Sequence, residues 1–262
     1  MSRYRSRRSA SQAKGQLARP GSRHQLRVAP LVLAGLLAGV LTSLPSHSFS
    51  ASPAFEDTIA QRALACTGCH GKEGRAASDG YYPRIAGKPA GYLYNQLLNF
   101  RDGRRSYPLM TRLLQHLSDD YLRELAAYFA GLDLPYPPPQ PAAASASLLA
   151  RGKTLVMNGD ESREIPACAR CHGEALTGVN PSVPGLLGLP RDYLNAQFGA
   201  WRIGQRAAQA PDCMAKLARQ LAADDVAALT AWIAAQPVPV PSTPAAALPA
   251  PMPLPCGGVP DR

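Results

Sequence analysis

The stretches Cys66-Thr-Gly-Cys69-His70 and Cys168-Ala-Arg-Cys171-His172 hold four of the six cysteines of this 262-residue chain. Both have the form C-x-x-C-H, which is the pattern that attaches a c-type haem. Two thiols at this spacing form thioethers with the two vinyl groups of one porphyrin, and the imidazole that follows reaches the iron. The sequence therefore predicts two covalently attached haem c groups, held by Cys66, Cys69, Cys168 and Cys171, with His70 and His172 as proximal ligands.

Two other kinds of site use paired cysteines. A zinc site built from two C-x-x-C pairs usually separates the pairs by about 15–20 residues, whereas these pairs begin at residues 66 and 168. A thioredoxin-like redox pair needs a strand–helix context and has no use for a histidine after the second cysteine in both copies. Haem attachment is the favoured interpretation over both alternatives.

The chain around the two motifs is a tandem repeat. Pro83-Arg-Ile-Ala-Gly-Lys-Pro-Ala-Gly-Tyr-Leu-Tyr-Asn-Gln96 aligns with Pro184-Gly-Leu-Leu-Gly-Leu-Pro-Arg-Asp-Tyr-Leu-Asn-Ala-Gln197 at an offset of 101 residues. Further along, Met110 aligns with Met214 at an offset of 104. Two copies indicate a duplication and not a solenoid.

Proline-rich stretches, which behave as semi-rigid spacers, bound the two copies. We predict a first repeat over 53–134, a Pro/Ala-rich linker over 135–146, a second repeat over 147–236 and a Pro-rich tail over 237–262.

Each repeat is predicted to be all-α. Tyr92, Gln96 and Phe100 share one helix face, and Ser118-Asp-Asp is typical of a capped helix start. Such small repeats, rich in alanine, need something else to fill the core. A haem around which the helices wrap meets that need.

The basic excess of the chain lies at its N-terminus. The formal charge is +10, but residues 1–27 hold eight basic residues and no acid, which leaves 20 basic and 18 acidic residues over 28–262. This balance disfavours nucleic-acid binding. The apolar run 28–41 follows, too short for a membrane span, and small residues come after it. We predict an export signal over 1–51 and a periplasmic protein; an uncleaved signal anchor, or peripheral contact, is the alternative association with a membrane.

Methionines supply the predicted distal ligands. Apart from His70 and His172, the chain has only His24 and His47, which lie in or beside the signal, and His116, so the second repeat has no second histidine. Met110 and Met214 follow their motifs at matched spacing and are predicted to be the distal ligands. His116 is expected at the surface, and Met157, which has no counterpart, in the core or at the surface. His/Met ligation closes both axial positions and suits electron transfer.

Both repeats resemble class I cytochrome c domains, and the pair resembles the diheme cytochrome c4 family over roughly residues 55–236. The resemblance implies a proline carbonyl that orients each proximal imidazole, at Pro83 and Pro184, and a basic group near the haem propionates, at Arg84. The second repeat has Gly185 in place of Arg84, so that role is not carried across. Tyr92, Tyr193, Phe100 and Trp201 are expected to pack in helix cores.

Cys213 and Cys256 complete the cysteine inventory. They are even in number, in a chain expected to be exported, and Cys213 immediately precedes Met214. We predict a disulfide that folds the tail back over the second repeat.

The predicted function is that of an exported diheme electron carrier and not of an enzyme. Its expected partners are a quinol-oxidising complex or dehydrogenase and a terminal oxidase or reductase. A cytochrome subunit of a dehydrogenase complex is the second possibility, and a diheme peroxidase the third.

Overall fold

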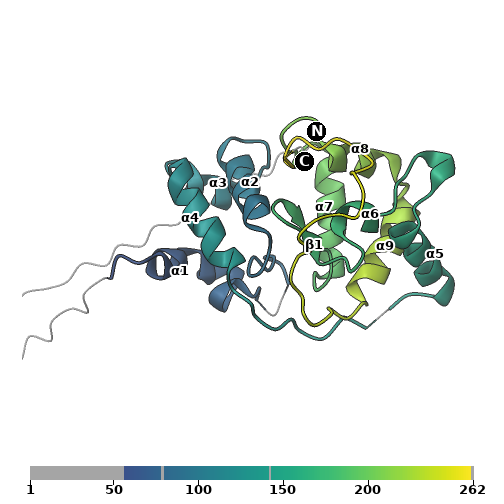
Figure 1. Cartoon of the computed structure of the whole chain (residues 1–262), viewed down its shortest axis with the longest axis horizontal. Coiled ribbons are helices and arrows are strands. Elements are labelled where there is room, and N and C mark those ends of the chain that lie inside the picture. The colour runs from purple at the N-terminus through teal and green to yellow at the C-terminus, as the bar shows by residue number, and fades with distance from the viewer. Residues whose placement is uncertain (1–55, 78–79, 142, 261–262) are drawn as a thin grey trace, which may run out of the picture. The chain divides into compact units, whose positions relative to one another are not determined.

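Two groups of helices follow one another along the chain in the computed structural model (Figure 1), which describes residues 56–77, 80–141 and 143–260. The predicted export signal, 1–51, lies outside the described residues. The first group comprises α1 (Ile59–His70), the 3-10 turn η1 (Lys72–Gly74), α2 (Ala90–Arg101), α3 (Pro108–Leu114) and α4 (Asp119–Ala130). The second comprises α5 (Ala146–Met157), η2 (Glu161–Arg163), α6 (Ala169–His172), α7 (Arg191–Arg202), α8 (Cys213–Gln220) and α9 (Ala223–Ala234).

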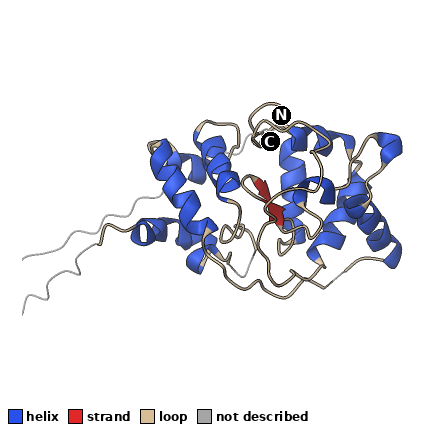
Figure 2. Cartoon of the chain, in the orientation of Figure 1, coloured by secondary structure: helices blue, strands red, loops and turns tan. Residues whose placement is uncertain are grey.

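The only strands within the described ranges are β1 (Gly178–Val179) and β2 (Val183–Pro184), two residues each and antiparallel. Figure 2 shows them in red among helices in blue. The all-α prediction is confirmed, since these strands form only one short hairpin. In the same described part of the chain, no helix is both long enough and apolar enough to cross a membrane.

In the first repeat, α4 packs against α2 and α1. Leu93 of α2 meets Leu125 and Phe129 of α4 in one buried cluster. The predicted helix start is confirmed: Ser118 is the N-cap of α4, and its Oγ accepts a 3.2 Å hydrogen bond from the amide of Tyr121. A side-chain cap of this kind satisfies an amide that the helix itself leaves without a partner.

In the second repeat, α5 crosses α9 at close range. A Cβ atom on Gly152 would lie 2.2 Å from the carbonyl oxygen of Ala228, so only glycine permits this approach. Helix α1 contains the first C-x-x-C-H motif, but in the second repeat residues 158–168 separate α5 from α6. Met157 ends α5 just before this segment and is 36% exposed, so of its two expected locations the surface is the correct one.

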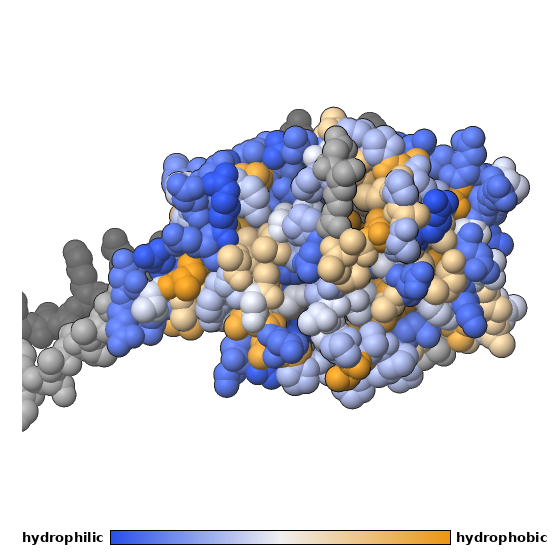
Figure 3. Space-filling model, in the orientation of Figure 1, coloured by the Kyte–Doolittle hydropathy of each residue, from blue (hydrophilic) through white to orange (hydrophobic). Residues whose placement is uncertain are grey.

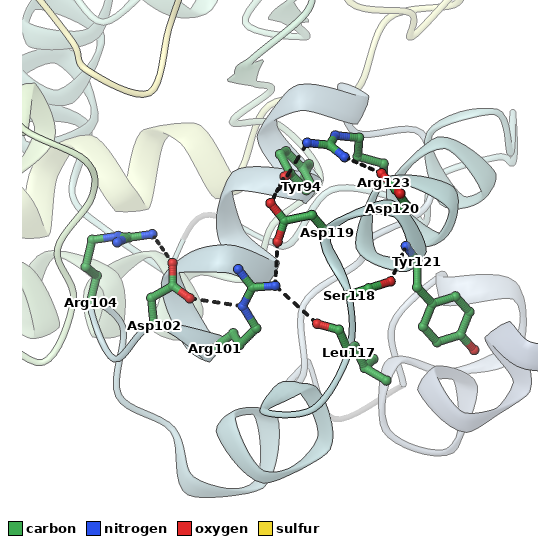
Figure 4. A network of polar contacts seen from close by, with 10 residues as sticks. All are labelled: Tyr94, Arg101, Asp102, Arg104, Leu117, Ser118, Asp119, Asp120, Tyr121 and Arg123. Carbon is green, nitrogen blue, oxygen red and sulfur yellow. Dashed lines mark hydrogen bonds and ion pairs between the residues drawn. The ribbon is translucent and has the colours of Figure 1, made fainter.

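A polar network fixes the segment that carries α3 (Figure 4). Arg101, at the end of α2, donates to the carboxylate of Asp119 at 2.6 Å and to the carbonyl oxygen of Leu117 at 3.1 Å. Asp102 accepts from both Arg101 and Arg104, at 3.0 and 2.9 Å. The end of α2 is thereby tied to the start of α4, and α3 lies on the loop between them.

The surface is mixed in character. On the face shown in Figure 3, hydrophobic residues lie in separate small groups among hydrophilic ones. The exposed large apolar side chains of the first repeat include Leu64, Tyr81, Leu109 and Leu113.

Candidate haem-binding site

One cavity of about 1140 Å³ brings the predicted site residues of both repeats together. This volume exceeds the ~300–1,000 Å³ that is usual for a pocket holding one small molecule. Every predicted site residue lines it: Cys66, Cys69, His70, Pro83, Arg84, Met110, Cys168, Cys171, His172, Pro184, Cys213, Met214 and Cys256.

Each motif histidine is the last residue of a helix and is held from behind by a proline carbonyl. Nδ1 of His70 lies 2.8 Å from the carbonyl oxygen of Pro83, and Nδ1 of His172 lies 2.7 Å from that of Pro184. A carbonyl can only accept, so Nδ1 carries the proton and Nε2 keeps a lone pair for a metal. Burial lowers the pKa of both imidazoles, which favours this neutral form.

The motif thiols are unsuited to dithiol exchange. Burial raises the pKa of Cys66 to about 11 and that of Cys168 to about 12, so neither forms the nucleophilic thiolate near neutral pH. Among the residues that the structure describes, no group of three or more His, Cys, Asp or Glu side chains could hold a metal ion. The four motif cysteines therefore do not make a zinc-type cluster.

The charge of the cavity lining fits a haem, which carries two propionate groups. Arg84, Lys88, Arg104, Arg105 and Arg206 line the cavity, against the carboxylates of Asp192 and Asp212 alone. Lys88 is 4% exposed and its Nζ donates to the carbonyl oxygen of Gly185 in the second repeat, at 3.3 Å. Burial, and then the charge of Arg84, lowers the pKa of Lys88 to about 8. A buried cation without a carboxylate partner is costly unless a bound anion compensates it.

Arg84 has a structural role that its sequence position did not reveal. Its guanidinium group stacks on the ring of Tyr136 at 3.9 Å and donates to the carbonyl oxygens of Leu134 and Pro135. The side chain thus holds the start of the linker against the first repeat. Its expected proximity to a propionate stays a prediction.

A cluster at the contact between the repeats was missed by sequence reasoning. Arg105 and Arg206 occupy equivalent positions and form an antiparallel β-bridge. Arg105 donates to Gln96 of its own repeat at 2.9 Å and to Gln197 of the other at 2.8 Å. Arg206 donates to Gln197 at 2.7 Å and to Gln96 at 3.3 Å. The repeat alignment places these arginines and glutamines at equivalent positions, but it does not indicate that the side chains of one repeat contact those of the other.

The paired aromatic residues also contribute to this contact. The hydroxyl of Tyr193 lies 3.4 Å from Arg105, and that of Tyr92 lies 3.4 Å from Arg206. Arg206 further stacks on Trp201 at 4.0 Å. The expectation of helix-core packing was therefore incomplete, because Tyr92, Tyr193 and Trp201 also contact arginines at the junction of the two repeats. Phe100, the fourth, is buried as expected, with Arg105 over its ring at 4.5 Å.

The predicted disulfide between Cys213 and Cys256 is present. Figure 1 shows the tail in yellow running past β1 towards α8. Ala245 pairs with Val179 of β1, and the amide of Gly257 donates to the carbonyl oxygen of Pro211 at 2.9 Å. The tail therefore lies along the second repeat, as expected from the sequence. His116 is exposed, also as expected.

Two helical repeats, each with a C-x-x-C-H helix, a proline carbonyl behind the histidine and a methionine on the same cavity, define a diheme class I cytochrome c. No protein-family model matches the chain. The thiosulfate dehydrogenase electron acceptor of Thiomonas intermedia is 36% identical over 191 residues, which cover 72% of this chain and 87% of that protein. Cytochrome c4 of Pseudomonas aeruginosa is 32% identical over 174 residues, 66% of this chain and 84% of that protein.

Solved structures agree with these sequence relatives. Reduced recombinant cytochrome c4 from Pseudomonas stutzeri superposes with a TM-score of 0.59 at 28% identity, covering 68% of this chain and 96% of that one. Thiosulfate dehydrogenase TsdBA from Marichromatium purpuratum also gives 0.59, at 34% identity, over 66% of this chain but only 36% of that one. The chain belongs to the diheme cytochrome c4 family, whose members are electron carriers with two covalently bound c-type haems.

Proposed function

We propose that this chain is a periplasmic electron carrier that takes electrons from a dehydrogenase and passes them to a further redox protein, and that it catalyses no reaction of its own. The observation that carries the proposal is the shared cavity, onto which both C-x-x-C-H motifs and both matched methionines open. In this assignment Cys66, Cys69, Cys168 and Cys171 hold the haems, and the axial ligands are His70, Met110, His172 and Met214.

The bound haems supply reversible one-electron chemistry at iron. The protein holds and orients them. The carbonyls of Pro83 and Pro184 fix the imidazole tautomers, and the network around Arg101 positions the loop that carries Met110. In the second repeat, Met214 is the second residue of α8, and the first residue of that helix, Cys213, is fixed by the disulfide.

A methionine at each distal position argues against peroxide chemistry, which needs an accessible iron coordination site. A diheme peroxidase is therefore the weaker alternative. Rapid peroxide turnover by the purified holoprotein would reverse this ranking.

Relatives favour a dehydrogenase as the electron donor. The sequence relatives include two thiosulfate dehydrogenase electron acceptors and, over 41% of this chain, the cytochrome subunit of sulfide dehydrogenase from Chlorobaculum tepidum. We propose a dehydrogenase of an inorganic sulfur compound as the partner, with the chain acting as a free carrier. Permanent assembly with that enzyme is the second candidate, and co-purification from the native source separates the two.

We further propose export through the segment 1–51, with cleavage near residues 48–52, and the repeat boundaries given above. Intact-mass measurement of the mature protein tests the cleavage site. A mass that includes residues 1–51 would contradict it and support a signal anchor.

A redox titration with haem quantification tests the central assignment. We expect two haems per chain, two methionine–iron charge-transfer bands and reduction by thiosulfate in the presence of a purified thiosulfate dehydrogenase. One haem per chain, or a missing band, would contradict the ligand set, and failure of reduction would contradict the proposed donor.

A further inference from the structure

The two repeats differ at one face although their haem motifs match. In the first repeat, Leu109 and Leu113 of α3 flank Met110, line the cavity and are 61% and 45% exposed. Tyr81, two residues before Pro83, also lines the cavity and is 64% exposed. Exposed apolar side chains therefore line the cavity beside the proposed distal ligand.

The equivalent face of the second repeat is covered. Cys213 stands at the position of Leu109, at the offset of 104 residues that relates the two methionines, and its sulfur binds Cys256 of the tail. Ser182 replaces Tyr81 and is buried against α2 of the first repeat, where a Cβ atom on Gly91 would lie 2.6 Å from its Oγ. The tail residues that line the cavity on this side are Met252, Leu254, Cys256, Gly258 and Val259.

The tail packs closely against the second repeat. A Cβ atom on Gly257 would lie 2.1 Å from the carbonyl oxygen of Ala210, so the tail backbone touches the loop before α8. Residues 237–260 contain nine prolines and no charged side chain. A stiff, uncharged tail of this kind blocks the approach of a second protein and offers that protein no complementary charge.

The open face of the first repeat carries one exposed cation, Arg112 of α3. The neighbouring Arg104 pairs with Asp102, and Arg105 lies at the contact between the repeats. Arg112 is exposed between Leu109 and Leu113. An apolar centre beside the exposed charge of Arg112 suits a partner whose docking face carries acidic residues around apolar ones.

We propose that acidic redox proteins dock on the first repeat at the face formed by Tyr81, Leu109, Arg112 and Leu113, because the tail occupies the equivalent face of the second repeat. This inference rests on the proposed electron-carrier function and adds that electrons enter and leave through the first repeat. The second haem then exchanges electrons with the first.

Two aligned cations provide a matched test. Arg112 of α3 and Lys216 of α8 are both exposed and are equivalent at the offset of 104 residues. Binding of the haem-loaded protein to the soluble domain of cytochrome b5, an acidic haem protein used as the probe, is measured by calorimetry at low ionic strength. We expect Arg112→Glu to weaken binding about tenfold and Lys216→Glu to weaken it less than twofold.

A third variant removes the disulfide that holds the tail. In Cys213→Ser/Cys256→Ser, the second face opens, and adding Lys216→Glu should then weaken binding by at least threefold relative to the released protein. Equal effects of Arg112→Glu and Lys216→Glu in the intact protein, or no effect of Arg112→Glu, would overturn the docking face. No sensitivity to Lys216→Glu after release would overturn the role of the tail.

These outcomes are separable from the proposed function. If the holoprotein binds as expected but is not reduced by the dehydrogenase, the proposed donor is wrong and the docking face stands. If it is reduced while the two charge reversals act equally, only the docking face is wrong.

Discussion

The side chain of Asn95 in α2 donates a 2.7 Å hydrogen bond to the carbonyl oxygen of Gly258, two residues beyond Cys256. The end of the tail is therefore held by the first repeat as well as by the disulfide in the second. The tail thus links the two repeats at a point remote in sequence from the linker.

Replacing both disulfide cysteines by serine should destabilise the second repeat. The bridge spans 43 residues, and the loop-entropy model gives about 4 kcal/mol for a closure of that length. We expect a loss of about 2–4 kcal/mol in the free energy of unfolding, measured by urea denaturation of the holoprotein. Reduction of the unmodified protein is the control and should give a similar loss; unchanged stability in both would contradict a structural role.

Met110→Leu and Met214→Leu should each remove half of the methionine–iron charge-transfer absorbance and lower one of the two reduction potentials, because thioether ligation raises the potential of the iron. Met157→Leu is the matched control, since Met157 is exposed and away from the cavity lining. A variant at 110 or 214 that keeps the full absorbance would show that the wrong ligand has been assigned.

Asp225→Asn should make the second repeat less stable at neutral pH and less sensitive to acid. The Asp225 side chain is fully buried, and it accepts from Arg163 at 2.6 Å, from Arg151 and from the amide of Ala222 at 2.9 Å. Burial alone would raise the pKa of Asp225, but these hydrogen bonds outweigh it and hold the pKa well below its usual range.

The sign of the pH dependence follows from that lowered pKa. The unfolded chain binds a proton near pH 4 and the folded protein only at lower pH, so the stabilisation is complete above about pH 5 and is lost as the pH falls. We expect Asp225→Asn to cost about 2–3 kcal/mol at pH 7, less than the ~3–5 kcal/mol for a fully buried pair, because both arginines reach solvent. Urea denaturation at pH 7 and at pH 3.5 measures the free energy of unfolding, and the exposed Asp120→Asn is the control. An equal pH dependence of stability in Asp225→Asn and in the unmodified protein would refute the prediction.

Arg206→Met should loosen the contact between the repeats. The Arg206 side chain is buried at this contact, with the Tyr92 hydroxyl and Gln96 of the first repeat as partners. We expect a loss of about 1–3 kcal/mol in the stability of the holoprotein and faster proteolysis within the linker 135–146. Arg123→Met, at an exposed position of α4, should change stability by less than about 0.5 kcal/mol. Unaltered stability and proteolysis in Arg206→Met would mean that this contact does not contribute to the stability of the protein.

The haem site could be predicted from the sequence because its chemistry is local. Two cysteines and a histidine must be adjacent to serve one porphyrin, and the matched spacing of Met110 and Met214 reflects one loop copied twice. The cap of α4 at Ser118 is local in the same way. The disulfide followed from counting thiols, since Cys213 and Cys256 had no other partner.

The contacts that the sequence could not predict join residues far apart in the chain. Arg105 meets Gln197, and Asn95 meets Gly258, without any periodicity that relates them. Arg84 could be expected near the cavity from its place after Pro83. Its contacts with the linker could not, because they depend on the path of the linker in the folded protein. Long-range pairing of this kind is decided by the packing of whole helices.

The β-bridge between Arg105 and Arg206 has a consequence for the origin of the chain. Because each side presents the same residues, an Arg, a Gln and a Tyr at equivalent positions, the contact is isologous, which is the arrangement found in two-fold symmetric homodimers. A single-repeat precursor with these three residues would already have possessed both halves of the interface. Gene fusion would then have needed only a linker, and divergence of the two copies would explain why only the second one carries a tail.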